Sequence, residues 1–293
     1  MTRPLKSPFD FTRPQPIIPA MRADFTPDLH HYALPDYTLT YTDTGAGPLL
    51  LLVHGSLCDC RYWKSQIVTL SRSHRVVAVN LRHYWPHQWN PECGPFSIDR
   101  HAHDLLGLID HLAAGPAHVV GHSRGGSVAL QMAVLAPQAI ATLALADPGV
   151  GLADHSDPRG GFRHDAMALI QNGDVDAGLA LFIDAVSGPD TWRRMVPWFQ
   201  EMVRENATTL SAQTAEPPFK LDAATVQSLA MPVLLVGGAL SPQPYPATLD
   251  RLEGLLPQAA RLTIAGSSHG MNLGNPRVFN AAVADFVAAQ SAA

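Results

Sequence analysis

One serine lies in a turn whose residue types suit nucleophilic chemistry. The motif GHSRG spans residues 121–125, after the apolar run 117–120 and before a helical pattern at 127–135. A strand, a sharp turn and a helix in this order strain the backbone of the central serine and present its hydroxyl. Side chains at Gly121 or Gly125 would collide with neighbouring elements in such a turn. The pattern predicts Ser123 as a nucleophile that attacks a carbonyl carbon.

A serine hydroxyl is a poor nucleophile until a base removes its proton, and the chain has 14 histidines that could do so. His269 lies in a loop after an apolar run, whereas His122 lies inside the turn, where a side chain is expected to point into packing. His101 and His103 fall on a predicted helix and are expected at its surface. No cluster of histidines has local spacing that suits a metal, so we expect neither a metal nor an organic cofactor.

Composition and charge indicate a compact globule without an evident macromolecular partner. Apolar residues make up 46% of the 293, charged residues 15%, and the formal net charge is -5. No block of like charge suggests binding to nucleic acid or to an anionic membrane. Cys58, Cys60 and Cys93 are too few for a disulfide framework, and the first two lack the spacing of a zinc site.

The order of patterns along the chain predicts an α/β fold. Short apolar runs alternate with helical segments, which is typical of a mostly parallel sheet flanked by crossover helices. One helix is expected over residues 98–112 after Ser97 as its N-cap, and a last helix begins at Asn275 and Pro276. The expected strands are residues 37–41, 49–53, 75–80, 117–120, 142–146, 232–236 and 261–264.

Two segments interrupt this alternation. Residues 1–27 are rich in proline and form an expected irregular arm, with no apolar stretch like that of a secretory signal. No run approaches the ~18 apolar residues that cross a bilayer, so we expect a cytoplasmic protein. Residues 151–230 have helix-like patterns without a convincing strand, and we expect a helical cap inserted into a core of residues 28–150 and 231–293. The alternative that the arm contacts a second subunit in a homo-oligomer stays open.

A second turn allows a family resemblance to be stated. His54, Gly55 and Ser56 follow the strand at 49–53, ahead of the serine turn. With these two motifs the chain resembles the α/β-hydrolase superfamily, which implies the α/β-hydrolase fold. The resemblance implies an oxyanion hole formed by the backbone N–H groups of Ser56 and Arg124. It also implies that His269 is the base, because the family carries this histidine in such a loop before the last helix.

The acid that supports the histidine departs from the common family pattern. An aspartate commonly follows the strand that here spans residues 232–236, but Leu240 stands at about its place. The family also uses the end of the strand after the nucleophile helix, where Asp147 follows residues 142–146. We therefore predict Asp147 as the acid that holds the His269 tautomer, with Asp154 and Asp157 as alternatives.

The resemblance implies a hydrolase that cleaves a carboxylic ester or lactone through an acyl-enzyme. Thioesters and carbon–carbon bonds of β-diketones use nearly the same chemistry and stay open. A ligand receptor or a catalytically weak interaction protein is the alternative class, favoured by the absent acid at Leu240. The expected cap is rich in large apolar residues, which suggests a small-molecule substrate with an apolar portion. The candidate substrate contacts are His83, Trp85, Trp192 and Trp198.

Overall fold

The computed structural model describes residues 26–90, 92, 94–152 and 161–291. The predicted N-terminal arm falls almost wholly outside these residues, as do Cys93, Asp154 and Asp157. Among the described residues, no helix is long and apolar enough to cross a membrane.

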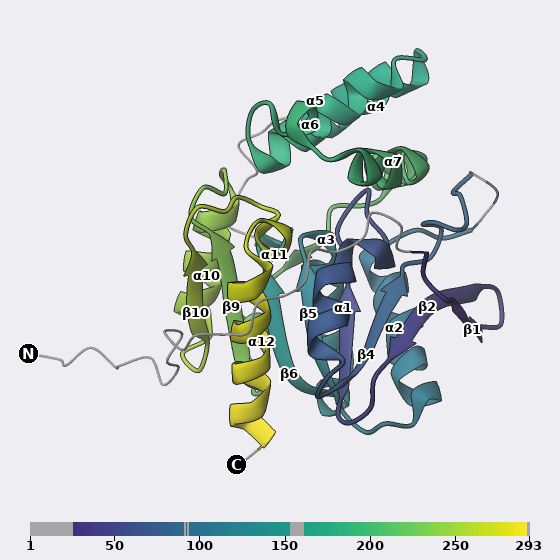
Figure 1. The fold of residues 1–293 in the computed structure, drawn as a ribbon. Coiled ribbons are helices and arrows are strands. Elements are labelled where there is room, and N and C mark those ends of the chain that lie inside the picture. The colour runs from purple at the N-terminus through teal and green to yellow at the C-terminus, as the bar shows by residue number, and fades with distance from the viewer. Residues whose placement is uncertain (1–25, 91, 93, 153–160, 292–293) are drawn as a thin grey trace, which may run out of the picture.

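An eight-stranded sheet forms the centre of the molecule, in the order β1-β2-β4-β3-β5-β6-β9-β10 (Figure 1). β1 and β2 pair antiparallel and β2 pairs antiparallel with β4, whereas the pairs from β4 to β10 are parallel. The mostly parallel sheet predicted from the sequence is therefore confirmed. The strands are β1 (His30–Ala33), β2 (Thr38–Thr44), β3 (Leu49–Val53), β4 (Arg75–Asn80), β5 (Ala117–His122), β6 (Ile140–Ala146), β9 (Val233–Gly238) and β10 (Ala260–Ile264).

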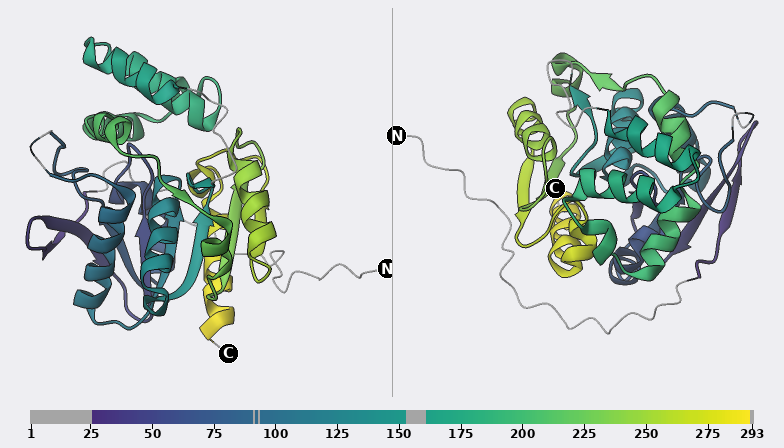
Figure 2. Two further views of the ribbon diagram at one scale, coloured as in Figure 1. Left: turned by 180° about the vertical axis from the view of Figure 1, so that it is seen from behind. Right: turned by 90° about the horizontal axis from the view of Figure 1, so that it is seen from above.

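Helices cover both faces of the sheet because successive strand residues point to opposite sides. In β3, Leu51 and Val53 pack in one core cluster and Leu50 and Leu52 in the other. The first cluster is covered by α2 (Ile98–Leu112), α3 (Arg124–Leu135) and α10 (Tyr245–Leu255), and the second by α1 (Lys64–Leu70) and α12 (Pro276–Ser291) (Figures 1 and 2). Fully burying one such side chain contributes about 1.5–3 kcal/mol, so this two-sided core fixes the sheet.

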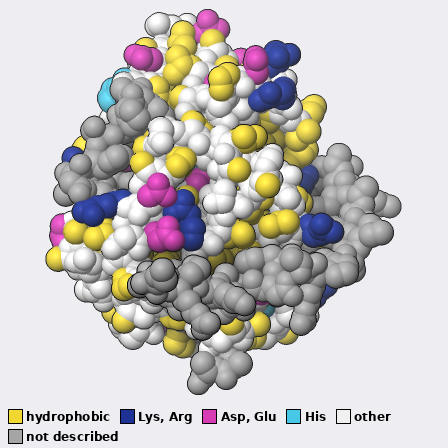
Figure 3. Space-filling view, turned by 90° about the vertical axis from the view of Figure 1, so that its left-hand side faces the viewer, with side chains coloured by type: hydrophobic (Ala, Val, Ile, Leu, Met, Phe, Trp, Pro, Cys, Tyr) yellow, Lys and Arg dark blue, Asp and Glu magenta, His cyan; other side chains and the backbone are white. Residues whose placement is uncertain are grey.

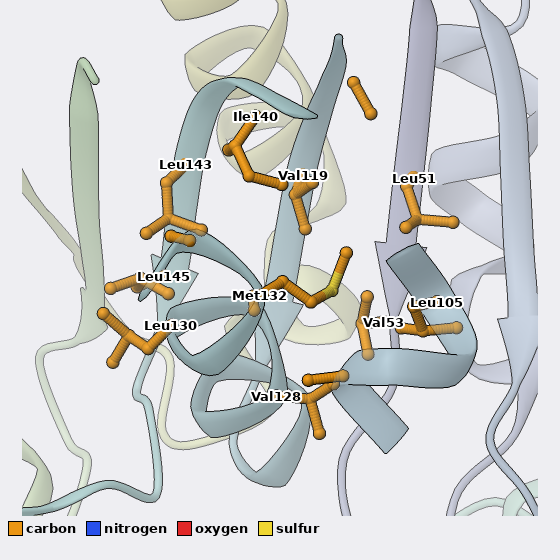
Figure 4. Packing of buried hydrophobic residues seen from close by; sticks show 14 of the residues in the cluster. Leu51, Val53, Leu105, Val119, Val128, Leu130, Met132, Ile140, Leu143 and Leu145 are labelled. Atoms are coloured by element: carbon orange, nitrogen blue, oxygen red, sulfur yellow. The ribbon is translucent and has the colours of Figure 1, made fainter. Parts of the chain in front are cut away.

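The helix behind the serine turn packs directly on the central strands. Figure 4 shows Val128 and Met132 of α3 near Val53 of β3 and Val119 of β5. These side chains are buried, which fixes the start of α3 relative to the ends of the strands. The N-cap of α2 is as predicted, since the Ser97 hydroxyl accepts from the amide of residue 100 at 3.1 Å.

The segment between β6 and β9 is mainly helical and lies above one end of the sheet (Figures 1 and 2). Two short strands, β7 (Gly151–Leu152) and β8 (Lys220–Leu221), pair parallel at its base. The expectation of no strand here is wrong, because a strand of two residues has no periodicity that a sequence could reveal. The helices are α4 (Phe162–Gln171), α5 (Val175–Ser187), α6 (Thr191–Arg194), α7 (Pro197–Glu205), α8 (Thr209–Ala215) and α9 (Ala223–Gln227).

Shorter elements complete the chain: the 3-10 helices η1 (Cys60–Trp63) and η2 (Pro137–Ala139), and α11 (Met271–Gly274). The side of the molecule that carries α10 and β10 has a mixed surface, where acidic and basic side chains lie next to each other (Figure 3). Arg261 pairs there with Asp250 at 3.1 Å and with Glu253 at 3.3 Å. This interspersed charge is consistent with the mild net charge of the chain.

Candidate active site

The direction of chain progression through the sheet reverses at β3, whose neighbours are β4 and β5. In open α/β sheets, such a reversal leaves a crevice at the carboxyl ends of the strands, where ligands bind. Ser56 follows β3, Ser123 follows β5, Asp147 follows β6 and His269 comes after β10. The fold therefore brings the sequence-predicted residues to one edge of the sheet.

Ser123 has a backbone conformation that non-glycine residues rarely adopt, with φ 53° and ψ -119°. Its amide donates to the carbonyl of Ala146 at 3.0 Å, and its own carbonyl accepts from the Gly149 amide at 2.9 Å. A Cβ atom added at Gly125 would run into the carbonyl oxygen of Val53. Contacts to two neighbouring strands thus impose the strained turn that the glycine pattern predicted.

Asp147 and His269 lie against each other at the carboxyl ends of the strands. Asp147 Oδ2 is 3.3 Å from His269 Nδ1, and the side chains are 0% and 5% exposed. Burial raises the pKa of Asp147 to about 7, and the hydroxyl of Ser241 is the largest influence in the opposite direction. The Asp147 carboxyl group is therefore placed to orient the His269 imidazole, and the protonation of one group affects that of the other.

Two aromatic rings enclose the imidazole of His269. The Tyr245 ring stacks on it with centroids 3.9 Å apart, and the His122 ring lies 4.6 Å away. His122 Nε2 also lies 2.7 Å from the backbone carbonyl of His269, so it is placed to donate there. Burial lowers the pKa of His122 to about 3, which keeps this ring neutral. His122 thus packs against the loop that carries His269, as expected for a side chain that points into packing. The contact of Tyr245 with His269 has no signal in the sequence.

The loop after β9 contributes a hydroxyl to the surroundings of Asp147. Leu240, which we had placed at the position of the absent acid, is 66% exposed. Its neighbour Ser241 donates its hydroxyl to Asp147 Oδ2 at 2.5 Å. Leu240 therefore points outward, and Ser241 is the residue of this loop whose side chain reaches Asp147. The sequence offered no signal for it, because loop length alone does not determine which side chain turns inward.

A cavity of about 620 Å³ lies at this edge of the sheet and is bordered by Ser123, Ser56 and Arg124. The Ser56 hydroxyl donates to the side-chain oxygen of Gln213 from α8 at 2.7 Å. The other lining residues come from the start of α2, from α3, the loop after β6, the inserted segment and α10, and include Ile98, Ser127, Pro148, Val150, Phe182, Val186, Thr214, Phe219, Tyr245, Thr248 and Arg251.

An ion pair joins the nucleophile helix to the inserted segment at the cavity wall. The guanidinium of Arg124 donates from Nη2 to Glu216 Oε2 at 2.9 Å and also binds the second carboxylate oxygen. It lies over the Phe96 ring, 4.6 Å from the centroid. The side chains of Arg124 and Glu216 are 6% and 13% exposed. The Arg124 side chain is therefore held in place independently of its backbone N–H.

None of the four predicted substrate contacts is among the described residues that line the cavity. His83 is 1% exposed and packs against the rings of Tyr37 and Phe96, with a backbone φ of 70°. Trp85 lies under the guanidinium of Arg61. Neither His83 nor Trp85 therefore lines this cavity.

The two tryptophans of the inserted segment pack within the protein instead of facing the cavity. Trp192 packs against the core of the inserted helices, and its amide donates to Asp184 at 2.9 Å. Trp198 stacks on Phe199 and lies under the ammonium of Lys64, 3.6 Å from the ring centroid. These two tryptophans of the segment are used for packing, which a composition count could not separate from substrate binding.

Buried polar residues outside this edge have structural surroundings. His101 is 0% exposed, so its predicted surface position is wrong, whereas His103 is exposed as expected. Cys58 and Cys60 are buried free thiols, and burial raises the pKa of both. Within the described parts of the chain, no group of three or more His, Cys, Asp or Glu side chains could hold a metal.

Comparison with known proteins matches residues 50–282 to the model of a family described as the alpha/beta hydrolase family. The chain is 25% identical over 269 residues to the 2-(acetamidomethylene)succinate hydrolase of Mesorhizobium japonicum. The aligned region covers 85% of this chain and 91% of that protein. The chain spans only 31% to 62% of the length of three other curated relatives.

Solved structures share the fold. The carboxylesterase CesB from Bacillus subtilis superposes with a TM-score of 0.74 at 18% identity, covering 90% of this chain and 92% of that one. Est816, described as an N-acyl homoserine lactone degrading enzyme, gives a TM-score of 0.71 at 22% identity, covering 88% of this chain and 100% of that one. At such identities the likeness extends to the fold alone.

Proposed function

Because the chain belongs to the alpha/beta hydrolase family, we propose that it is a serine hydrolase that cleaves a carboxylic ester or lactone. The observation that carries the proposal is the strained Ser123 backbone at the border of the cavity. The contact between Asp147 and His269 supports it. An ester or lactone is favoured because carboxylesterase and lactone-degrading structures share the fold.

In the proposed reaction, Ser123 Oγ attacks the carbonyl carbon while His269 takes the hydroxyl proton. Asp147 holds the imidazole and stabilises the imidazolium that forms. The intermediate then collapses to the acyl-enzyme, and His269 returns the proton to the leaving alcohol. Water attacks the acyl-enzyme, gives a proton to His269, and releases the carboxylic acid with Ser123 restored.

The developing oxyanion is proposed to bind the backbone N–H groups of Ser56 and Arg124. Arg124 is the first residue of α3, so its amide lies at the helix end where partial positive charge accumulates. Ser56 borders the same cavity from the turn after β3. Each such donor typically lowers the barrier by about 3 kcal/mol.

The substrate proposed for this cavity has an apolar portion next to the reacting carbonyl. Phe182, Val186 and Phe219 contribute apolar surface to the lining. At the cavity wall, the charges of Arg124 and Glu216 neutralise each other, so neither residue requires a charged group on the substrate. Short-chain and aromatic esters and lactones are therefore the substrates to test first.

The test is covalent labelling with a fluorophosphonate, together with hydrolysis of a short p-nitrophenyl ester. The Ser123→Ala variant should lose both, whereas Ser228→Ala should keep both, because the Ser228 hydroxyl bonds only to Thr225 in α9 among its described contacts. Labelling that persists in Ser123→Ala, or a wild-type protein that is neither labelled nor active on esters, lactones and thioesters, would refute the proposed function.

A further inference from the structure

We propose that Ser241 is a positioning residue for this reaction, whose hydroxyl fixes the Asp147 carboxylate that holds His269. The inference rests on the proposed function, because it assigns Ser241 a place in the same proton equilibrium. Ser241 would act through Asp147 and would not touch the substrate; it is not among the described residues that line the cavity.

The contact geometry makes the orientation of the carboxylate depend on Ser241. Ser241 Oγ donates to Asp147 Oδ2 at 2.5 Å, and the same oxygen faces His269 Nδ1 at 3.3 Å. A carboxylate oxygen can accept both bonds. Asp147 Oδ1 is buried without a hydrogen-bond partner among the described residues. The two bonds to Oδ2 are therefore the side-chain hydrogen bonds that hold the carboxyl group toward the imidazole, and the backbone amide of Gly238 also acts on this group.

Backbone hydrogen bonds set the place of the hydroxyl. The amide of Ala239 donates to Ile264 in β10 at 3.0 Å, and the amide of Leu240 donates to Ser267 at 2.9 Å. The Ser241 amide closes the turn by donating to Gly238 at 3.1 Å. The loop after β9 is thus tied to β10 and to the loop that carries His269, so the hydroxyl approaches Asp147 from a fixed direction.

The charges around Asp147 give the direction of the expected effect. Burial is the largest influence on the pKa of Asp147 and raises it, whereas the Ser241 hydroxyl is the first of the groups that lower it. His122, Arg261 and the Gly238 amide also lower it, and His269 lies against the carboxyl group. Removing the hydroxyl leaves these groups in place and withdraws one donor from the ionised form. The carboxyl group should then ionise at higher pH.

The experiment compares the pH dependence of kcat/KM for a p-nitrophenyl ester in Ser241→Ala, Ser241→Thr and the wild type. In Ser241→Ala, the acidic limb of kcat/KM should move up by about one pH unit, as expected for the loss of a hydrogen bond to a charged group, so that kcat/KM at pH 7 falls by about fivefold or more. Ser241→Thr retains the hydroxyl and should restore the limb.

Ser268→Ala is the matched control. The Ser268 hydroxyl donates to Ser187 at 2.7 Å and to the Leu240 carbonyl at 3.2 Å, so it supports the same loop without touching Asp147. A lost loop contact can change kcat/KM in this variant, but the acidic limb should stay in place. A second readout needs no turnover: carbon-13 NMR titration of the Asp147 carboxyl, identified by its absence in Asp147→Asn, should show a higher midpoint in Ser241→Ala.

The outcomes separate the two proposals. An active wild type whose limb and carboxyl midpoint are unchanged in Ser241→Ala refutes the role of Ser241 and leaves the serine hydrolase standing. Equal losses in Ser241→Ala and Ser268→Ala with unmoved limbs reduce Ser241 to a loop support, which also overturns the inference. Absence of both labelling and turnover in the wild type refutes the proposed function itself, and the role of Ser241 in catalysis with it.

Discussion

Asp147→Asn is expected to change how stability depends on pH, because the buried carboxyl group binds its proton more tightly in the folded protein. Its pKa is raised from 3.8 to about 7, mainly by burial. Between these values the folded state keeps a proton that the unfolded chain has lost. The stability that this proton provides is fully present below the unfolded pKa and is lost as the pH rises through the folded one.

The magnitude follows from the difference in proton binding. Between pH 5 and pH 8, the wild type should lose about 2–3 kcal/mol through Asp147, nearly all of it below pH 7. Asparagine has a similar shape and does not ionise, so the variant lacks this loss. The stability of Asp147→Asn relative to the wild type should therefore rise by about 2–3 kcal/mol over the same range.

Urea unfolding of both proteins at pH 5, 6.5 and 8 measures this difference directly. The other titrating groups are common to both proteins, so their effects largely cancel in the comparison. A stability difference that is the same at all three pH values would show that the Asp147 pKa is not raised. A difference that moves the other way would mean that the ionised carboxylate is stabilised by His269 more than burial opposes it.

Two further predictions concern neighbouring residues. In an Asp147→Asn background, adding Ser241→Asp should recover kcat/KM by about tenfold or more, because the side chain at position 241 reaches the site of the Asp147 carboxyl group. Adding Leu240→Asp should not, because the side chain at position 240 is 66% exposed. Ester hydrolysis by the double variants measures both effects, and rescue by position 240 alone would contradict the prediction. Glu216→Gln leaves the buried Arg124 guanidinium without its carboxylate and should lower the free energy of unfolding by about 3 kcal/mol, as measured by urea unfolding. An unchanged free energy of unfolding would show that the ion pair does not contribute to stability.

Elements with strong periodicity could be predicted from the sequence. The runs 49–53 and 75–80 match β3 and β4 in full, and the helix over 98–112 matches α2. Each is defined by a local pattern of apolar residues that the sheet or the core then buries. β1 was not predicted, because four residues with exposed side chains at three positions leave no alternation to recognise.

The burial of His101 has a signal in the sequence. His101 lies three residues after Ile98 and four before Leu105, both of which are buried, so it falls on the apolar stripe of α2. Its imidazole lies 3.3 Å from the Arg82 carbonyl, which provides a hydrogen-bond partner for one ring nitrogen within the core.

The contacts of Ser241 and Tyr245 could not have been predicted from the sequence. Both belong to the segment after β9, and their approach to Asp147 and His269 depends on how that segment is tied to β10. Such contacts join residues far apart in the chain and leave no local pattern. By contrast, a local motif of a strand, a turn and a helix predicts the role of Ser123, and the family resemblance that this motif supports implies the role of His269.

The pairing of β7 with β8 has a consequence for engineering. These strands lie where the helical segment leaves the sheet and rejoins it, so the two connections run side by side. A segment whose ends are adjacent can be exchanged without separating the elements to which it is attached. Since Gln213 and Glu216 of this segment also reach the cavity, a chimera joined at β7 and β8 would import a new wall for the pocket while keeping the residues at the sheet edge. The two short strands therefore mark the natural boundaries for grafting a new specificity onto this scaffold.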